Sequence, residues 1–237
     1  MSEFMLIVTE DERAHESEDP KAMAALIEKR AAFAEGARQS GVLADAGRFR
    51  PSREGKRVRR QGGRVDVIDG PFTDDGRALA AYYYVRADSA EAAAKIAADC
   101  PVLPGDDVDV RSIMKGSVDV DKDSKPGKIF ALGVLGSAET EEGWVATMDR
   151  IDADSQGMSP LPGRCGGVRL MPPKTGRRVA TDGGRRAIFD GPFLESKEVI
   201  GGVMFARMTS IEEAVRWATD APFITHGALE IRELWRS

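Results

Sequence analysis

The tetrapeptide Asp-Gly-Pro-Phe occurs twice in this chain, at residues 69–72 and again at residues 190–193. A shift of 121 residues superimposes the two copies, and residues 49–114 then align with residues 170–235 without a gap. In this alignment 19 of the 66 positions are identical. An internal repeat of this length outweighs other local signals when an architecture is inferred. The sequence therefore predicts two copies of one structural unit.

The segment between the two copies is polar and charged, and it ends in Pro126-Gly127. Segments of this composition are typical of linkers. The sequence predicts a first repeat at residues 1–114, a linker at residues 115–127 and a second repeat at residues 128–237.

Each repeat shows the same order of elements. A short apolar run opens it, at residues 4–8 and again at residues 129–135, and predicts a strand. A helix follows, with Asp19 as N-cap and Pro20 as first residue in the first repeat, and with Thr140 as cap in the second. Paired glycines then predict a tight hairpin, and the tetrapeptide predicts a turn. The rest of each repeat predicts a strand, a second helix and a last strand.

This order predicts an α+β fold made of two ferredoxin-like repeats. A sheet with helices on one face must cover its other face, and a second copy in the same chain can do this. We therefore expect an intramolecular pseudo-dimer, with its sheets either packed face to face or joined edge to edge into a barrel-like body. Strand alternation places Tyr82 and Tyr84 on one face and Tyr83 on the other, where core packing is the simplest role for all three.

Composition excludes several classes of protein. The chain has 237 residues and a formal charge of −5, which argues against a nucleic-acid-binding protein. No apolar run approaches the length of a membrane span, and the start lacks the pattern of a signal peptide. The two cysteines, Cys100 and Cys165, are expected to be reduced thiols in a cytoplasmic protein. The two histidines, His15 and His226, are far apart, so no metal site is expected. No cofactor is expected either. His15 lies in a polar stretch, EDERAHESED, and is expected to be solvated.

The tetrapeptide allows two interpretations that are compatible with each other. In the first it is a turn, in which glycine frees the backbone, proline fixes φ and phenylalanine is buried. In the second, a rigid turn points the carboxylate of Asp69 or Asp190 into a cleft, where it acts as a general base or binds a cation.

Arginines are the other candidates for a site. Arg111 and Arg232 occupy the same place on the last strand of their repeats, where an arginine needs a partner, and Asp69 and Asp190 are the expected partners. Basic strips that include Arg57 and Arg178 precede both tetrapeptides. Such a strip is either a solvated hairpin or a surface that recognises an anion or an acidic protein.

The second tetrapeptide is followed by LESKEVIGG, by a helix that ends in Ala221-Pro222, and by HGALEIREL. With these segments the chain resembles the YCII-related (DGPF) family over nearly its whole length. The resemblance implies a dimeric α+β barrel of ferredoxin-like subunits in small bacterial proteins, some of them associated with sigma factors. It also implies a His–Asp site, of which the motif carries over the aspartates Asp69 and Asp190. No histidine can be matched, because His15 and His226 lack counterparts in the other repeat.

Two functions stay open. The first is a binding or regulatory module that holds a small anionic ligand or a protein such as a sigma factor. The second is a cofactor-independent enzyme with Asp190 or Asp69 as the acid–base group and Arg232 or His226 orienting an anionic substrate. The first repeat departs from the second after the tetrapeptide, so a site that involves Lys197 is expected in the second repeat only.

Overall fold

The computed structural model describes residues 1–118, 120, 126–136, 149–150, 159–182, 185–191, 199–221, 224 and 227–235. The first repeat contains β1 (Ser2–Asp11), α1 (Glu12–Ser17), α2 (Pro20–Gln39), β2 (Leu43–Phe49), η1 (Ser52–Glu54), β3 (Lys56–Gln61), β4 (Arg64–Asp69), β5 (Arg77–Ala87), α3 (Ala90–Ala98) and β6 (Asp107–Val118). The second contains β7 (Lys128–Gly136), β8 (Arg164–Leu170), η2 (Pro173–Thr175), β9 (Arg177–Asp182), β10 (Arg185–Asp190), β11 (Val199–Met208), α5 (Ile211–Asp220) and β12 (Gly227–Trp235).

Eight of these strands form a closed antiparallel barrel. The order is β1, β5, β2, β12, β7, β11, β8 and β6, and β6 pairs with β1 to close the ring. Each repeat contributes four neighbouring strands to the barrel. When these four strands are numbered in sequence order within their repeat, they follow one another around the barrel as fourth, first, third and second. The two sets join at the seams between β2 and β12 and between β6 and β8. Of the two arrangements that the sequence left open, the edge-to-edge barrel is the one observed.

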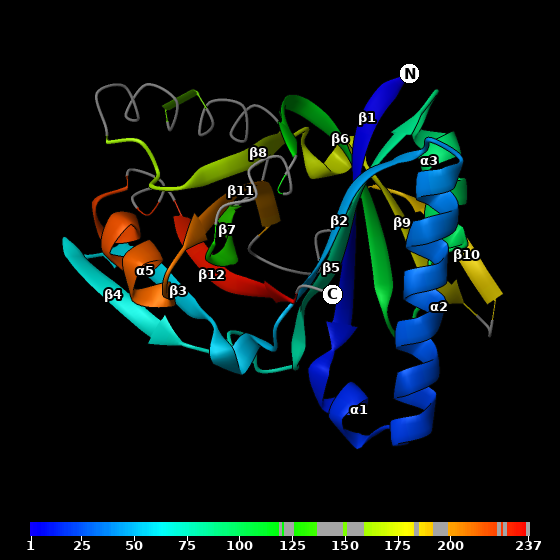
Figure 1. Cartoon of the computed structure of the whole chain (residues 1–237), viewed down its shortest axis with the longest axis horizontal. Helices are drawn as coiled ribbons and strands as arrows, with labels where there is room; N and C mark the ends of the chain where they lie inside the picture. Colours follow the sequence, from blue (N-terminus) through cyan, green and yellow to red (C-terminus); the bar gives the residue numbers. More distant parts are fainter. Residues whose placement is uncertain are drawn as a thin grey trace.

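The helices lie outside the barrel, with α2 and α3 over the first repeat and α5 over the second (Figure 1). Asp19 caps α2 as predicted, since its side chain accepts a hydrogen bond from the backbone N–H of Ala22. The first helix predicted for the second repeat, with Thr140 as its cap, lies outside the described residues.

Each hairpin crosses to the other repeat. Strand β3 pairs with β12, and β9 pairs with β6, so the β3–β4 hairpin lies beside α5 and the β9–β10 hairpin lies beside α3 (Figure 1). Val58 of the first repeat is buried in the apolar core under α5, and its counterpart Val179 is buried in the core of the first repeat. This exchange ties the two repeats together.

The described residues form three apolar cores, one inside the barrel, one beneath α2 and α3, and one beneath α5. Tyr82 and Tyr84 are buried inside the barrel, whereas Tyr83 packs under α2 with its ring edge-on to Phe33. This arrangement confirms the alternation predicted from the sequence and the assignment of all three rings to the core.

Strand β6 continues to Val118, four residues into the segment expected to be a linker. Its last residues, Lys115 to Val118, pair with β8, although only Val118 among these four has an apolar side chain buried inside the barrel. Backbone hydrogen bonding at a seam does not require apolar side chains, which explains why composition alone misplaced this boundary. Within the part of the chain that the structure describes, no helix is long and apolar enough to cross a membrane.

Candidate functional site

The glycine of the tetrapeptide makes a close backbone contact in both repeats. The N–H of Gly70 donates to the carbonyl of Gly55 at 3.3 Å, and the N–H of Gly191 donates to the carbonyl of Gly176 at 3.1 Å. A Cβ on Gly70 would lie 1.8 Å from the carbonyl oxygen of Ser52. A Cβ on Gly191 would lie 2.6 Å from the carbonyl oxygen of Pro173. The glycine thus allows the turn to pack closely against the preceding 3-10 helix, which is η1 in the first repeat and η2 in the second.

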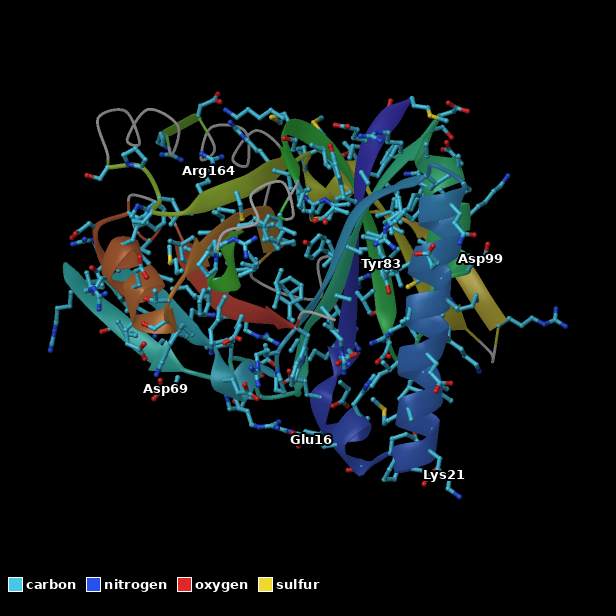
Figure 2. The ribbon with its side chains drawn as sticks, viewed as in Figure 1. Glu16, Lys21, Asp69, Tyr83, Asp99 and Arg164 are labelled. Atoms are coloured by element: carbon cyan, nitrogen blue, oxygen red, sulfur yellow. The ribbon has the colours of Figure 1, made fainter. Side chains whose placement is uncertain are left out.

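The aspartates of the tetrapeptide lie on the outside of the molecule. The side chain of Asp69 is 77% exposed and pairs with the Lys56 ammonium, and Figure 2 shows it at the outer edge of the β3–β4 hairpin. The side chain of Asp190 is 80% exposed, and its carboxylate lies 2.8 Å from Nε of Arg177. The predicted pairing of these aspartates with Arg111 and Arg232 is wrong. Hairpin register places Lys56 and Arg177 directly opposite them instead.

A cleft of about 760 Å³ opens at one end of the barrel, where β1 and β7 end and where β6 and β12 begin. Both repeats line it. Its charged lining residues are Arg57, Asp74, Asp75, Arg77, Asp107, Asp109, Arg111, Arg178 and Glu230. Three of the predicted ligand-binding residues, Arg57, Arg111 and Arg178, are therefore brought together here.

Two arginine–carboxylate pairs in the cleft join one repeat to the other. Arg178 contacts Asp109 through two nitrogens, with Nε at 2.7 Å and Nη2 at 3.1 Å from the two carboxylate oxygens. Arg57 contacts Glu230 through Nη2 at 2.8 Å. The residues of the first pair occupy the positions equivalent to those of the second in the repeat alignment. The cleft therefore contains two equivalent ion pairs, each of which joins one repeat to the other.

Behind the cleft, Arg232 is only 2% exposed and has several partners. Its guanidinium donates to the carbonyl of Arg50 and contacts the carboxylates of Glu230 at 3.1 Å and Glu12 at 3.4 Å. Its counterpart Arg111 is equally buried and donates to the carbonyl of Met171, at the position equivalent to Arg50. Burial lowers the pKa of Arg111 to about 10, against the opposing charge of Asp109.

Phe72 is the member of the first tetrapeptide that reaches the cleft. The Arg57 guanidinium lies 4.8 Å from the centre of its ring, a distance at which a cation is attracted to an aromatic face. The turn therefore serves the cleft through its phenylalanine, while its aspartate points away. Phe193, Lys197 and His226 lie outside the described residues, so the candidate roles given to Lys197 and His226 stay predictions.

A buried cluster of charged residues near the cleft was not predicted from the sequence. His15 on α1 is 8% exposed, and its Nε2 lies 2.9 Å from the Asp106 carboxylate. Its Nδ1 lies 3.5 Å from Glu10, which also contacts Arg30 at 3.3 Å. The expectation that His15 is solvated is wrong, because α1 folds back onto the turn before β6. His15 and Asp106 are 91 residues apart in the sequence, so no local sequence pattern predicts their contact.

The donor atoms of Glu10, His15 and Asp106 lie within 4.8 Å of one another, the spacing of a set that could hold a metal ion. Arg30 already supplies a cation there, since its guanidinium contacts Glu10 at 3.3 Å and Asp106 at 4.0 Å. The geometry therefore fits a buried ionic network better than a metal centre.

The pKa of His15 is raised. Burial opposes protonation most strongly, but the hydrogen bond to Asp106 and the charges of Glu10 and Asp106 together outweigh it. A raised folded-state pKa means that the folded protein binds the proton more tightly than the unfolded chain. The stabilisation is complete below the unfolded pKa, near 6.5, and is lost as the pH rises through the folded value.

We expect His15→Gln to lower the free energy of unfolding by about 1–2 kcal/mol at pH 6, because it weakens a buried hydrogen bond to a carboxylate. This deficit should shrink as the pH is raised toward 9, measured by urea denaturation at several pH values. The exposed Glu16→Gln on the same helix is the control, and its difference from the wild type should stay constant over this range. A His15→Gln deficit independent of pH would contradict a protonated, paired histidine.

The fold and the cleft together define a class: a barrel made of two fused copies of one α+β unit, with a charged cleft shared by the copies at its mouth. The YCII-related domain matches residues 3–117 and again residues 128–237. The chain therefore belongs to the YCII-related family and contains two tandem copies of its domain, as its sequence indicated.

Solved structures that resemble the chain at low identity include the following two. An anthrone oxidase-like protein is 9% identical with a TM-score of 0.44, over 99% of this chain and 92% of the other. A chlorite dismutase-like protein is 10% identical with a TM-score of 0.46, over 100% of this chain and 96% of the other. Both TM-scores are below 0.5, so neither likeness supports a functional argument. No curated protein matches the sequence.

Proposed function

We propose that this YCII-related protein is a binding module for a small anionic molecule, and that its ligand occupies the cleft at the mouth of the barrel. One observation carries the proposal: the cleft gathers Arg57, Arg111 and Arg178 from strands of both repeats. Guanidinium groups recognise carboxylates and phosphates through several N–H donors at once. The volume of about 760 Å³ lies within the range of small-molecule sites, about 300–1,000 Å³.

The arginines are held in place before any ligand arrives. Arg178 is fixed by two contacts to Asp109, and Arg57 by its contacts with Glu230 and the Phe72 ring. Side chains that are already ordered lose less conformational entropy on binding, which favours affinity. The ion pairs across the two repeats thus act as a scaffold for recognition.

The enzyme alternative rested on Asp69 and Asp190. Both carboxylates are largely exposed, lie outside the cleft and are paired with basic residues of their own hairpins. A general base must lie within hydrogen-bonding reach of its substrate. This position favours the binding module over catalysis by the motif aspartates.

A finer architecture is part of the proposal. We infer that each repeat is a ferredoxin-like unit and that the barrel is an intramolecular pseudo-dimer of two such units. The strand order within each repeat and the equivalent pairs Arg57–Glu230 and Arg178–Asp109 support this inference.

The test is calorimetric titration of the protein with a panel of small carboxylates and their neutral amides. We expect carboxylates to bind more tightly than the matched amides, and Arg178→Met to weaken that binding at least tenfold, about 1.4 kcal/mol. The matched control is Arg185→Met, which removes an exposed arginine of the same hairpin that does not line the cleft. Equal loss in both variants, or no binding by any carboxylate, would contradict the proposed site.

A further inference from the structure

Each crossed hairpin leaves one strand at an edge of the sheet. Among the described strands, β4 pairs with β3 alone and β10 pairs with β9 alone. Figure 1 shows the β9–β10 hairpin at the side of the first repeat, with β10 on its outer margin. A strand at an edge presents backbone N–H and C=O groups to which a further strand can add. The two hairpins are therefore candidate surfaces for association with another chain.

Backbone groups of β10 are directed away from its neighbour β9. The N–H of Gly191 donates to the carbonyl of Gly176, so the residue that follows β10 turns its backbone toward β9. Backbone groups alternate between the two sides of a strand, so those of Arg186, Ile188 and Asp190 point to the outer side. The outer side of β10 thus offers hydrogen-bonding groups to a further strand.

Two apolar side chains of β10 are exposed beside these groups. Ile188 is 46% exposed and Phe189 is 39% exposed. Charged residues flank them, with Arg186 on one side and Asp190 on the other. An apolar pair at the centre of an edge strand favours pairing with another strand, and the flanking charges restrict which strand fits.

The side chains of β10 are complementary to those of a second β10. Two identical edges that pair antiparallel are related by a twofold axis, which passes through one residue because like backbone groups must face each other. With the axis at Ile188, this residue lies opposite its own copy and Ala187 lies opposite Phe189. Arg186 then lies opposite Asp190, and the symmetry forms this ion pair twice. Apolar pairs and opposite-charge pairs across neighbouring strands both stabilise a sheet.

Arg186 and Asp190 do not pair within one chain. They are four residues apart along a strand, a distance of about 13 Å at the rise of an extended chain. Arg186 donates to the carbonyl of Ala97 at 3.0 Å, and its Nε has no hydrogen-bond partner among the described residues. The Asp190 carboxylate is largely exposed beside Arg177, and a carboxylate accepts more than one donor. Both charged groups can therefore pair with a second copy.

The edge of β4 lacks this complementarity. In the repeat alignment, Val65 stands at the position of Arg186. An antiparallel pair of β4 strands with its axis at Val67 would therefore place Asp69 opposite an apolar side chain. Moving the axis by one residue to Asp66 would place two like charges opposite each other. The two repeats have thus diverged at this edge, and β10 is the strand suited to self-association.

We propose that two copies of this chain associate through β10, paired antiparallel about a twofold axis at Ile188, with Arg186 of each copy opposite Asp190 of the other. Such a contact is closed, because each copy uses the same edge and no free copy of that edge remains. It covers a small surface, so we expect a dimer that dissociates on dilution. The exposed aspartate of the second tetrapeptide then takes part in assembly.

The test is sedimentation velocity of the full chain over a wide range of concentrations. The wild type should show a reversible monomer–dimer equilibrium. Arg186→Asp and Asp190→Arg should each weaken the dimer about tenfold or more, because each change places two like-charge pairs across the axis. The two substitutions combined restore opposite charges in the proposed register. The combined variant should therefore recover a dissociation constant within a few-fold of the wild type.

A lysine at the axis tests the strand itself. Ile188→Lys should prevent dimer formation, since it would place two cations opposite each other on an edge. Val67→Lys is the matched control, because Val67 is 47% exposed and occupies the equivalent position on β4. This variant should dimerise as the wild type does. Thermal denaturation of every variant checks that it remains folded.

Several outcomes would overturn the proposal. A wild type that stays monomeric at every concentration excludes the dimer. Loss of the dimer in Val67→Lys would assign the contact to β4, and failure of the combined charge variant to recover would exclude the proposed register. Species that grow beyond the dimer would indicate pairing of β4 with β10, which does not close.

Discussion

Gly70→Ala is expected to lower the free energy of unfolding by about 3 kcal/mol or more, because the new methyl group would meet a backbone carbonyl. Its Cβ would lie 1.8 Å from the Ser52 oxygen, a separation that no side-chain rotation can relieve. Overpacking of a rigid site costs about 1–3 kcal/mol and occasionally more, and here the obstacle is main chain. The turn must move away from η1, which would also displace Phe72 from the cleft.

The measurement is urea denaturation, with Gly191→Ala and Asp69→Asn alongside. Gly191→Ala should cost less than Gly70→Ala, since its Cβ would lie 2.6 Å from the Pro173 oxygen. Asp69→Asn should change stability by no more than about 0.5 kcal/mol, because it alters an exposed surface pair. If Asp69→Asn proved as costly as Gly70→Ala, the carboxylate would have the structural importance assigned here to the glycine.

Much of the fold could be predicted from the internal repeat, because two equivalent copies can be detected in a single sequence. The matched tetrapeptides gave the two equivalent units, and the alternation at Tyr82–Tyr84 gave the two faces of β5. Two open sheets in one chain left two ways of covering their bare faces. Hydrogen bonding at the seams between β2 and β12 and between β6 and β8 decided between them. Such seams depend on backbone edges, which leave no residue pattern.

The candidate site was predicted in part. Arg57, Arg111 and Arg178 were singled out by their matched positions, and they do meet in one cleft. Their partners could not be predicted, because each hairpin crosses to the other repeat. Asp109 and Glu230 therefore face arginines from the other half of the chain.

The capping pattern at Ser210 shows the limit of local rules. Ser210 and Glu213 have the spacing of a capping box, yet Glu213 accepts hydrogen bonds from the backbone and hydroxyl of Thr209 instead. Ser210 is still the N-cap residue of α5, although its side chain makes no capping hydrogen bond. The position of the helix start was thus encoded locally, while the choice of bonding partner was not.

The buried network around Arg232 should be the most sensitive electrostatic feature of the protein. Arg232→Met removes the cation that contacts Glu230 at 3.1 Å and Glu12 at 3.4 Å, while both carboxylates stay largely buried. Breaking a buried pair by removing one partner costs about 3–5 kcal/mol. Glu230 keeps its contact with Arg57, so the loss falls mainly on Glu12, which keeps its hydrogen bonds from Ser52. We expect a loss of this size in the free energy of unfolding, measured by urea denaturation at neutral pH.

Two further variants separate burial from charge. Arg38→Met makes the same substitution in an exposed pair with Glu35 on α2 and should cost less than about 0.5 kcal/mol. Adding Glu230→Gln to Arg232→Met should cost less than the sum of the single changes, with a coupling of about 1–3 kcal/mol. The double variant removes one of the two carboxylates that lost a contact with Arg232, so part of the penalty disappears, although Arg57 then loses its contact with the Glu230 charge. If Arg232→Met were as mild as Arg38→Met, the inter-repeat network would position the cleft without stabilising the fold.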